Sequence, residues 1–404
     1  MKIKAFLLLG AFALFMGACK DDDEKDKFSS LSPEEHREAI EDNALDVFNK
    51  AKQAGDLESM DVLIELITLI SNSEFEGDAF AVDFNSYLID KFKYAQSLPG
   101  LKAASEDKFS FKEGFESFAG IYTYNPETES WDKEASTSQL TFKFTSRLGK
   151  AVVSTLDNVT TFSGLHPEMS KDLDDFLTSA NFKLKVEDKE LISLLFISAF
   201  DAKGIPNKIE EVLKVEDFEF VYKLALTNSV YRIEQDYKYK GETLFGYLFE
   251  NKGTFDAEEM LFGDADEVIY DGTISNSNLR VTVGKYRAEG KSDWNGLNKK
   301  LAKASEGDIT SEEELYMFMA DAYNKYIDIK IRDIKANEII ATGDFYAFEQ
   351  EDYFGEEYWD LDFRMVFPDG SLMDESFFQD GFANLITEVN EFFAKLEAKF
   401  RGKR

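Results

Sequence analysis

The chain has 404 residues and a formal net charge of −33, because 79 acidic residues face 46 basic ones. Hydrophobic residues make up 44% and aromatic residues 14%, which excludes an intrinsically disordered chain and supplies material for a large core. The acidic balance argues against a nucleic-acid partner, since phosphate binding needs an excess of lysine and arginine. One cysteine and two histidines exclude an internal disulfide and argue against histidine-rich metal sites, so no cofactor is expected.

The first residues are typical of an export signal. Lys2 and Lys4 precede an apolar run over 5–16, which is shorter than the ~20 residues that a membrane-spanning helix needs. Small residues then lead into Cys19, the only cysteine of the chain. The pattern predicts a signal peptide over 1–18.

The junction Met16-Gly17-Ala18-Cys19 resembles the lipobox of bacterial lipoproteins, with Met16 at the position where Leu is preferred. The resemblance implies that Cys19 becomes the first residue of the mature chain and carries the acyl groups, palmitate among them, that hold the protein in a membrane. The alternative is a signal peptide that is cut elsewhere and leaves a free thiol.

Residues 19–30 are predicted to be the acylated cysteine and an acidic tether, because a run this polar cannot be buried. Within it, a lysine followed by acidic residues resembles the surface-export signal of Bacteroidota lipoproteins. The resemblance implies an outer-membrane lipoprotein that faces the cell exterior, whereas the plain reading is a solvated tether. The residues of this signal are Lys20, Asp21, Asp22, Asp23 and Glu24.

Residues 31–108 are predicted to be helical. The segment Ser32-Pro33-Glu34-Glu35 has the form of a capping box and opens a helix that should end near Gly55. A second helix after Asp56 carries an apolar stripe, and a third is expected over 83–97. The stripe predicts a buried helical layer, with a partner-binding groove as the alternative. Its members are Val62, Leu63, Leu66, Ile67 and Ile70.

Residues 109–404 are predicted to be rich in β-strands, because apolar and polar residues alternate there with a period of two. Such strands have one buried face, which suits an antiparallel sheet. Helices are expected near 311–325 and 375–400, the latter amphipathic and packed on the sheet. The predicted class is therefore α+β, with a large antiparallel sheet that is free to curve and that forms one compact unit with 31–108. The clearest strands fall at 140–144, 182–186, 218–226, 231–239, 244–249, 279–283, 327–331 and 359–367.

No sequence motif indicates catalysis. Nucleophile-elbow, P-loop, dinucleotide, HExxH and EF-hand patterns are absent from the sequence. Glycoside hydrolysis needs two carboxylates, but 79 acidic residues make neighbouring pairs unavoidable. The sequence thus predicts neither an enzyme nor a catalytic residue. The segment 120–144 and the turn 367–371 resemble uncharacterised Bacteroidota lipoproteins, and this resemblance implies no activity.

Two acidic segments are candidate sites. Asp264, Asp266 and Glu267 could bind a hard cation through loop oxygens, but a solvated turn before the next strand is the favoured interpretation. The second segment, near residue 355, combines aromatic rings with carboxylates, a pairing that can hold sugar rings. Its free candidates are Tyr353, Phe354 and Tyr358, whereas Trp359 falls on the apolar side of the alternation.

Together these patterns predict a lipid-anchored cell-surface protein with a non-catalytic binding or structural role. The membrane is a partner through the lipid on Cys19, and a protein, glycan or lipid partner is left open. One alternative is a carrier of a hydrophobic ligand, because the chain has 38 phenylalanines and a phenylalanine-rich sheet face could line a cavity. A second alternative is an extracytoplasmic hydrolase that uses carboxylates.

Overall fold

The computed structural model describes residues 27–72, 110–171, 173–258, 274–306, 309–351 and 357–373, together with Phe377 and 387–388. These residues form an α+β fold with five α-helices and a large, open, mostly antiparallel sheet of fifteen strands, which confirms the predicted class. They belong to two compact units. The first is drawn from Gln53–Gly241 and Phe255–Asp271, and the second from Met1–Lys52, Glu242–Thr254 and Gly272–Arg404.

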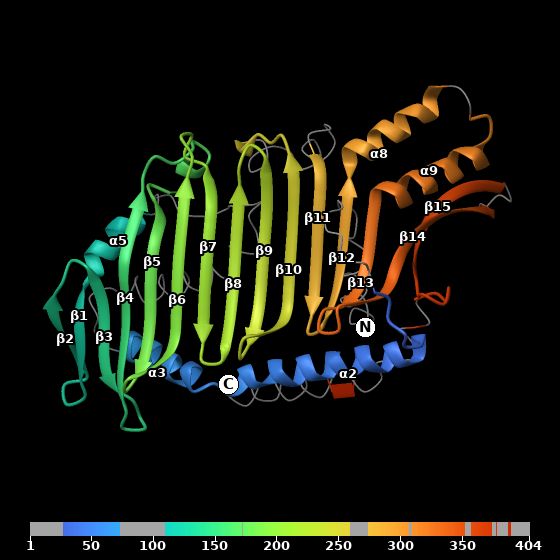
Figure 1. Cartoon of the computed structure of the whole chain (residues 1–404). Helices are drawn as coiled ribbons and strands as arrows, with labels where there is room; N and C mark the ends of the chain where they lie inside the picture. Colours follow the sequence, from blue (N-terminus) through green and yellow to red (C-terminus); the bar gives the residue numbers. More distant parts are fainter. Residues whose placement is uncertain are drawn as a thin grey trace. The chain divides into compact units, whose positions relative to one another are not determined.

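The sheet of the first unit contains nine strands in the order β9-β8-β7-β6-β5-β4-β3-β1-β2 (Figure 1). Neighbouring strands are antiparallel except for β1 and β3, which are parallel. The strands are β1 (Gly120–Asn125), β2 (Ser130–Ala135), β3 (Gln139–Thr145), β4 (Ala151–Phe162), β5 (Phe176–Val186), β6 (Lys189–Phe200), β7 (Pro206–Val215), β8 (Phe218–Leu226) and β9 (Val230–Tyr239).

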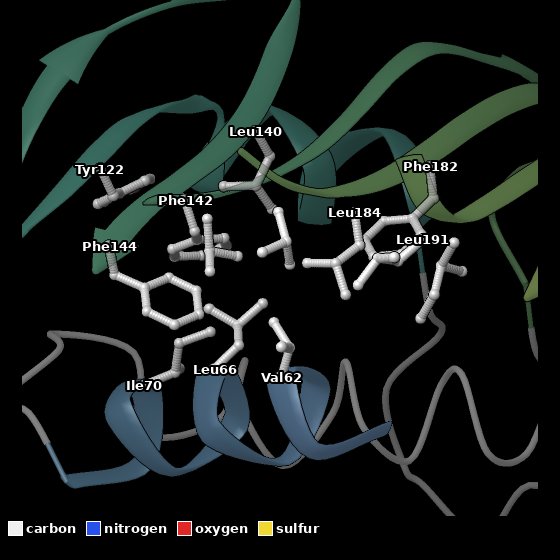
Figure 2. Packing of buried hydrophobic residues seen from close by; sticks show 13 residues of the cluster. Val62, Leu66, Ile70, Tyr122, Leu140, Phe142, Phe144, Phe182, Leu184 and Leu191 are labelled. Carbon is white, nitrogen blue, oxygen red and sulfur yellow. The ribbon is translucent and has the colours of Figure 1, made fainter. Parts of the chain in front are cut away.

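Helix α3 (Glu58–Asn72) buries its apolar stripe against one face of this sheet. Figure 2 shows Val62, Leu66 and Ile70 of the helix pointing toward the side chains of β3 and β5. Leu184 of β5 is fully buried in this cluster. The helical spacing of the stripe and the alternation of the strands therefore meet in one core, as the sequence predicts for a buried helical layer.

The short helix α5 (Phe111–Phe118) is held at its N-terminus by two side chains. Ser110 accepts a hydrogen bond from the Glu113 backbone N–H at 3.1 Å, as an N-cap residue does. Asp175, which is buried, accepts from the Ser110 hydroxyl and from the Phe111 N–H. The carboxylate thus satisfies a free backbone N–H group and lies at the positive end of the helix dipole.

The second unit contains six consecutive antiparallel strands. Three helices accompany them, and α2 and α8 lie at opposite ends of strand β12 (Figure 1). The strands are β10 (Glu242–Gly253), β11 (Ile274–Val283), β12 (Tyr286–Asp293), β13 (Ile327–Asp333), β14 (Glu338–Glu351) and β15 (Glu357–Val366), and the helices are α2 (Pro33–Lys52), α8 (Trp294–Leu301) and α9 (Glu312–Tyr326).

Helix α2 begins at the predicted capping box. The Ser32 backbone N–H donates to the Glu35 carboxylate at 2.8 Å, and the Glu35 N–H donates to the Ser32 hydroxyl at 3.3 Å. Further along, Asn43 binds both sides of the turn between β11 and β12. Its amide donates to the Val283 carbonyl at 2.9 Å and accepts from the Lys285 N–H at 3.0 Å. These two bonds fix the helix on the turn.

Helices α8 and α9 cover one face of β13 to β15. Leu297 of α8 and Ala322 of α9 pack against Ile327, Ile329 and Phe345 of the sheet. The predicted helix near 311–325 is confirmed as α9. The helix predicted over 83–97 lies outside the described residues. Of the helix predicted over 375–400, only Phe377 and 387–388 are described. Within the described ranges, no helix has both the length and the apolar character that crossing a membrane requires.

Candidate functional site: the open face of the β14–β15 hairpin

Strands β14 and β15 pair in register, so alternate residues of both strands share one face. Phe345, Leu361 and Phe363 point to the side that packs on α8 and α9. The opposite side, called here the hairpin face, has no such cover from these helices. It is formed by Asp344, Tyr346, Phe348 and Gln350 of β14 and by Tyr358, Asp360, Asp362 and Arg364 of β15.

An ion pair and an aromatic ring lie at one end of the hairpin face. Arg364 donates to the Asp344 carboxylate from two guanidinium nitrogens, at 2.7 and 2.6 Å. The guanidinium carbon lies 4.4 Å from the ring centre of Tyr346, a cation–π contact. Asn324 of α9 also donates to Asp344, at 3.2 Å. The pair therefore has a fixed position although the Arg364 side chain is 42% exposed.

Two aspartates alternate along β15 and each joins a side chain of β14. The Tyr346 hydroxyl donates to Asp362 at 3.2 Å, and Gln350 donates to Asp360 at 2.8 Å. Partial desolvation and the neighbouring Asp362 carboxylate both raise the pKa of Tyr346, so its hydroxyl remains a hydrogen-bond donor at neutral pH. Each carboxylate has about four lone-pair sites, which leaves acceptor capacity for a ligand.

The aromatic rings of the hairpin face are half-buried and lie near the carboxylates. The centroids of Tyr346 and Phe348 are 5.7 Å apart with the rings inclined at 39°. Tyr358 lies directly opposite Gln350. The hairpin face thus combines apolar ring surfaces with carboxylate and amide groups, an arrangement that can bind a molecule carrying both C–H surfaces and hydroxyl groups.

The predicted site residues have different outcomes. Tyr358 lies on the hairpin face, while its predicted companions Tyr353 and Phe354 lie outside the described residues. The acidic segment with Asp264, Asp266 and Glu267 also lies outside them, as do Cys19 and the export signal Lys20–Glu24. Among the described residues, no group of three or more His, Cys, Asp or Glu side chains is placed to hold a metal ion.

Sequence reasoning named only Tyr358 among the eight residues of the hairpin face and missed the other seven, including Tyr346, Phe348 and Gln350 of β14. Strand β14 has aromatic residues on both of its faces, because Phe345 is core and its neighbour Tyr346 is not. A search for simple alternation therefore passes over it. The place of these β14 residues in the sequence could have identified them. They directly precede the predicted aromatic and acidic segment, and a hairpin turn would pair the two segments.

Comparison with known proteins gives no relative. No family model matches the chain. No match is found among curated proteins or among solved structures.

The described chain starts beside the beginning of β14. Phe28 forms a parallel β-bridge with Ile339. The Ser29 N–H donates to the Ile339 carbonyl and the Ile339 N–H donates to the Lys27 carbonyl, both at 2.8 Å. Lys27 also forms an ion pair with Glu338. The end of the predicted tether is thus bound to the first residues of β14, while Gln350 lies about 37 Å further along that strand, at ~3.4 Å per residue.

Proposed function

We propose that the chain is a lipid-anchored protein of the bacterial outer surface that binds a carbohydrate through the hairpin face without chemically changing it. The anchor rests on the basic start, the short apolar run and the single cysteine at Met16-Gly17-Ala18-Cys19. The observation that carries the binding function is the hairpin face itself, where aromatic rings and carboxylates share an accessible surface.

The docked N-terminus is consistent with a hairpin face that extends away from the membrane anchor. Cys19 and Lys27 are eight residues apart, so the tether spans at most about 28 Å. A lipid on Cys19 would keep the start of β14 within that distance of the anchor. The hairpin face extends along β14 away from its docked end, which suits a ligand outside the cell.

A carbohydrate suits the face better than a lipid or an acidic polymer does. Sugar rings have C–H surfaces, which pack on aromatic rings, and hydroxyl groups, which bind carboxylates and amides. The face places the rings of Tyr346 and Phe348 beside the carboxylate of Asp360. A lipid chain would remove water from the charged carboxylates of Asp360 and Asp362, which is unfavourable even though Gln350 and Tyr346 each donate one hydrogen bond to them. An acidic polymer would be repelled, because the three aspartates of the face outnumber its single arginine. The proposed ligand is therefore an uncharged polysaccharide.

The test is retention of the full chain, extracted in mild detergent, on a panel of insoluble neutral polysaccharides. The wild-type protein should be retained, and Tyr346→Ala and Tyr358→Ala should each weaken binding about tenfold, equivalent to ~1.4 kcal/mol. Phe245→Ala is the matched control, because this aromatic side chain is 43% exposed and belongs to β10. It should bind like the wild type.

Two results would overturn the carbohydrate assignment. One is that the folded wild-type protein is retained on none of the polysaccharides. The other is that both tyrosine variants keep wild-type retention while their circular dichroism spectra are unchanged. Retention on anionic lipid vesicles alone would likewise contradict it.

A further inference from the structure

His36 is a buried histidine in the first turn of α2. It is 2% exposed, and its ring stacks on Phe367 with centroids 5.9 Å apart and planes inclined at 16°. Neither ring nitrogen has a hydrogen-bond partner within the described part of the chain. A buried polar group without a partner is unfavourable, and a charged one is much more so. The site therefore suits only the neutral imidazole.

The residues just before His36 carry the docked N-terminus. The His36 backbone N–H donates to the Ser32 carbonyl at 3.0 Å, so His36 lies one helical turn beyond Ser32. Lys27–Ser32, called here the N-terminal latch, reaches β14 through the bridge at Ile339. On the other side of His36, Ala39 and Ile40 pack into the cluster that contains Phe367. Movement of the imidazole would thus disturb both the cluster and the latch.

Four charged groups influence His36, one from each element nearby. They are Glu35 on α2, Glu338 on β14, Asp333 on β13 and Lys285 in the β11–β12 turn. Burial lowers the pKa of His36, and this effect exceeds the opposing attraction of the three carboxylates. Two of those carboxylates already have cationic partners, because Glu338 pairs with Lys27 and Asp333 with Lys285.

We propose that His36 makes the docking of the N-terminus sensitive to mild acid, because protonation expels its ring from the cluster and releases the N-terminal latch from β14. The docked state binds the proton less well than the released state. Above a pH of about 6.5, the ordinary pKa of histidine, both states are neutral and docking is fully stable. Below it, the released state gains a proton and docking weakens.

Release would lengthen the connection to the membrane. With the latch docked, the free tether ends at Lys27; with the latch released, it extends to Ser32, five residues further, or about 17 Å of added reach. The inference goes beyond the proposed function and is independent of carbohydrate binding. It can be tested on the protein in detergent, so its failure would leave the hairpin face unaffected.

The test is amide hydrogen exchange between pH 7.5 and 5.5, read as protection factors relative to the intrinsic exchange rate at each pH. The informative amides are those of Ser29 and Ile339, which form the bridge. In the wild type their protection should fall by up to tenfold per pH unit below pH 6.5, since one proton is taken up. In His36→Phe, which keeps an aromatic ring but cannot titrate, protection should not change with pH.

His166→Asn is the matched control. His166 is the second of the chain's two histidines and belongs to the first unit, so this variant should keep the wild-type pH dependence. Equal pH dependence in the wild type and His36→Phe would overturn the inference. Should His36→Phe fail to fold, an NMR titration of the two histidines in the wild type decides the matter. A measured His36 pKa at or above 6.5, with the bridge amides still protected from exchange, would refute the inference.

Discussion

The contact between α2 and the β11–β12 turn allows a quantitative prediction. Gly284 in this turn has φ +57°, and a Cβ added there would lie 2.3 Å from Oδ1 of Asn43. The side chain that fixes α2 therefore occupies the space that an alanine would need. The substitutions Asn43→Ala and Gly284→Ala should be strongly coupled, because the second must displace the group that the first removes.

The expected magnitudes follow from the contacts. Asn43→Ala removes two hydrogen bonds, worth ~1 kcal/mol each, and should cost about 2 kcal/mol. Gly284→Ala places an L-residue in the left-handed region, at about 1–2 kcal/mol, and also displaces Asn43, for a total of about 3–4 kcal/mol. In the double variant the two bonds are already absent, so only the backbone term and the close approach of the new Cβ to Val47 Cγ2, at 2.9 Å, are added; both of these are also present in Gly284→Ala. The sum of the single effects should exceed the double effect by about 2 kcal/mol.

Hydrogen exchange of the α2 amides measures these changes as free energies of local opening, which avoids assuming that both units unfold together. Amides of α3, which belongs to the first unit, serve as the internal reference and should not respond. Additive effects within ~0.5 kcal/mol would refute the reasoning. An Asn43→Ala variant with unchanged α2 protection would refute it as well.

Two predictions concern the first unit. Asp175→Ala should lower the local stability of α5 by about 2–4 kcal/mol, since it removes a helix cap and leaves buried donors unpaired; exchange of the α5 amides measures this, and unchanged protection would contradict it. Leu184→Ala should cost about 2–5 kcal/mol because it opens a cavity at a fully buried position. The matched control Leu195→Ala, at a position 39% exposed, should cost under ~1 kcal/mol, and equal shifts of the two urea midpoints would count against the packing described.

The sequence predicted those parts of the fold that depend on local patterns. The capping box at Ser32 and Glu35 forms with both of its hydrogen bonds, and the alternation over 140–144 is confirmed in β3. Strand β7 was missed because Ile209 and Leu213, spaced as in a helix, share one face of the sheet while Val212 lies on the other. Its conformation depends on pairing with β6 and β8, which no local pattern encodes.

Strand β12 was missed for a related reason. It has only two apolar residues, Tyr286 and Ala288, too few to show a period. Ala288 lies between Val281 of β11 and Ile331 of β13, so the neighbouring strands supply the apolar surface that the strand itself lacks. Long-range pairing therefore determines this element, whereas the sequence reports mainly local preference.

The candidate site shows the same division. Composition pointed to Tyr358 and its acidic neighbours, because aromatic and acidic residues are adjacent in the chain there. The partners Tyr346 and Asp362 are brought together only by the register of the hairpin. Sequence could identify the kind of chemistry in this segment, but the grouping of side chains on one face requires the paired strands.

The most direct test of the proposed function is metabolic labelling of the host with an alkyne fatty acid, followed by protease treatment of intact cells. The wild-type chain should carry the label and should be digested from intact cells, whereas Cys19→Ser should carry no label. A wild-type chain that is unlabelled, or that the protease reaches only after lysis, would contradict a lipid-anchored protein of the outer surface.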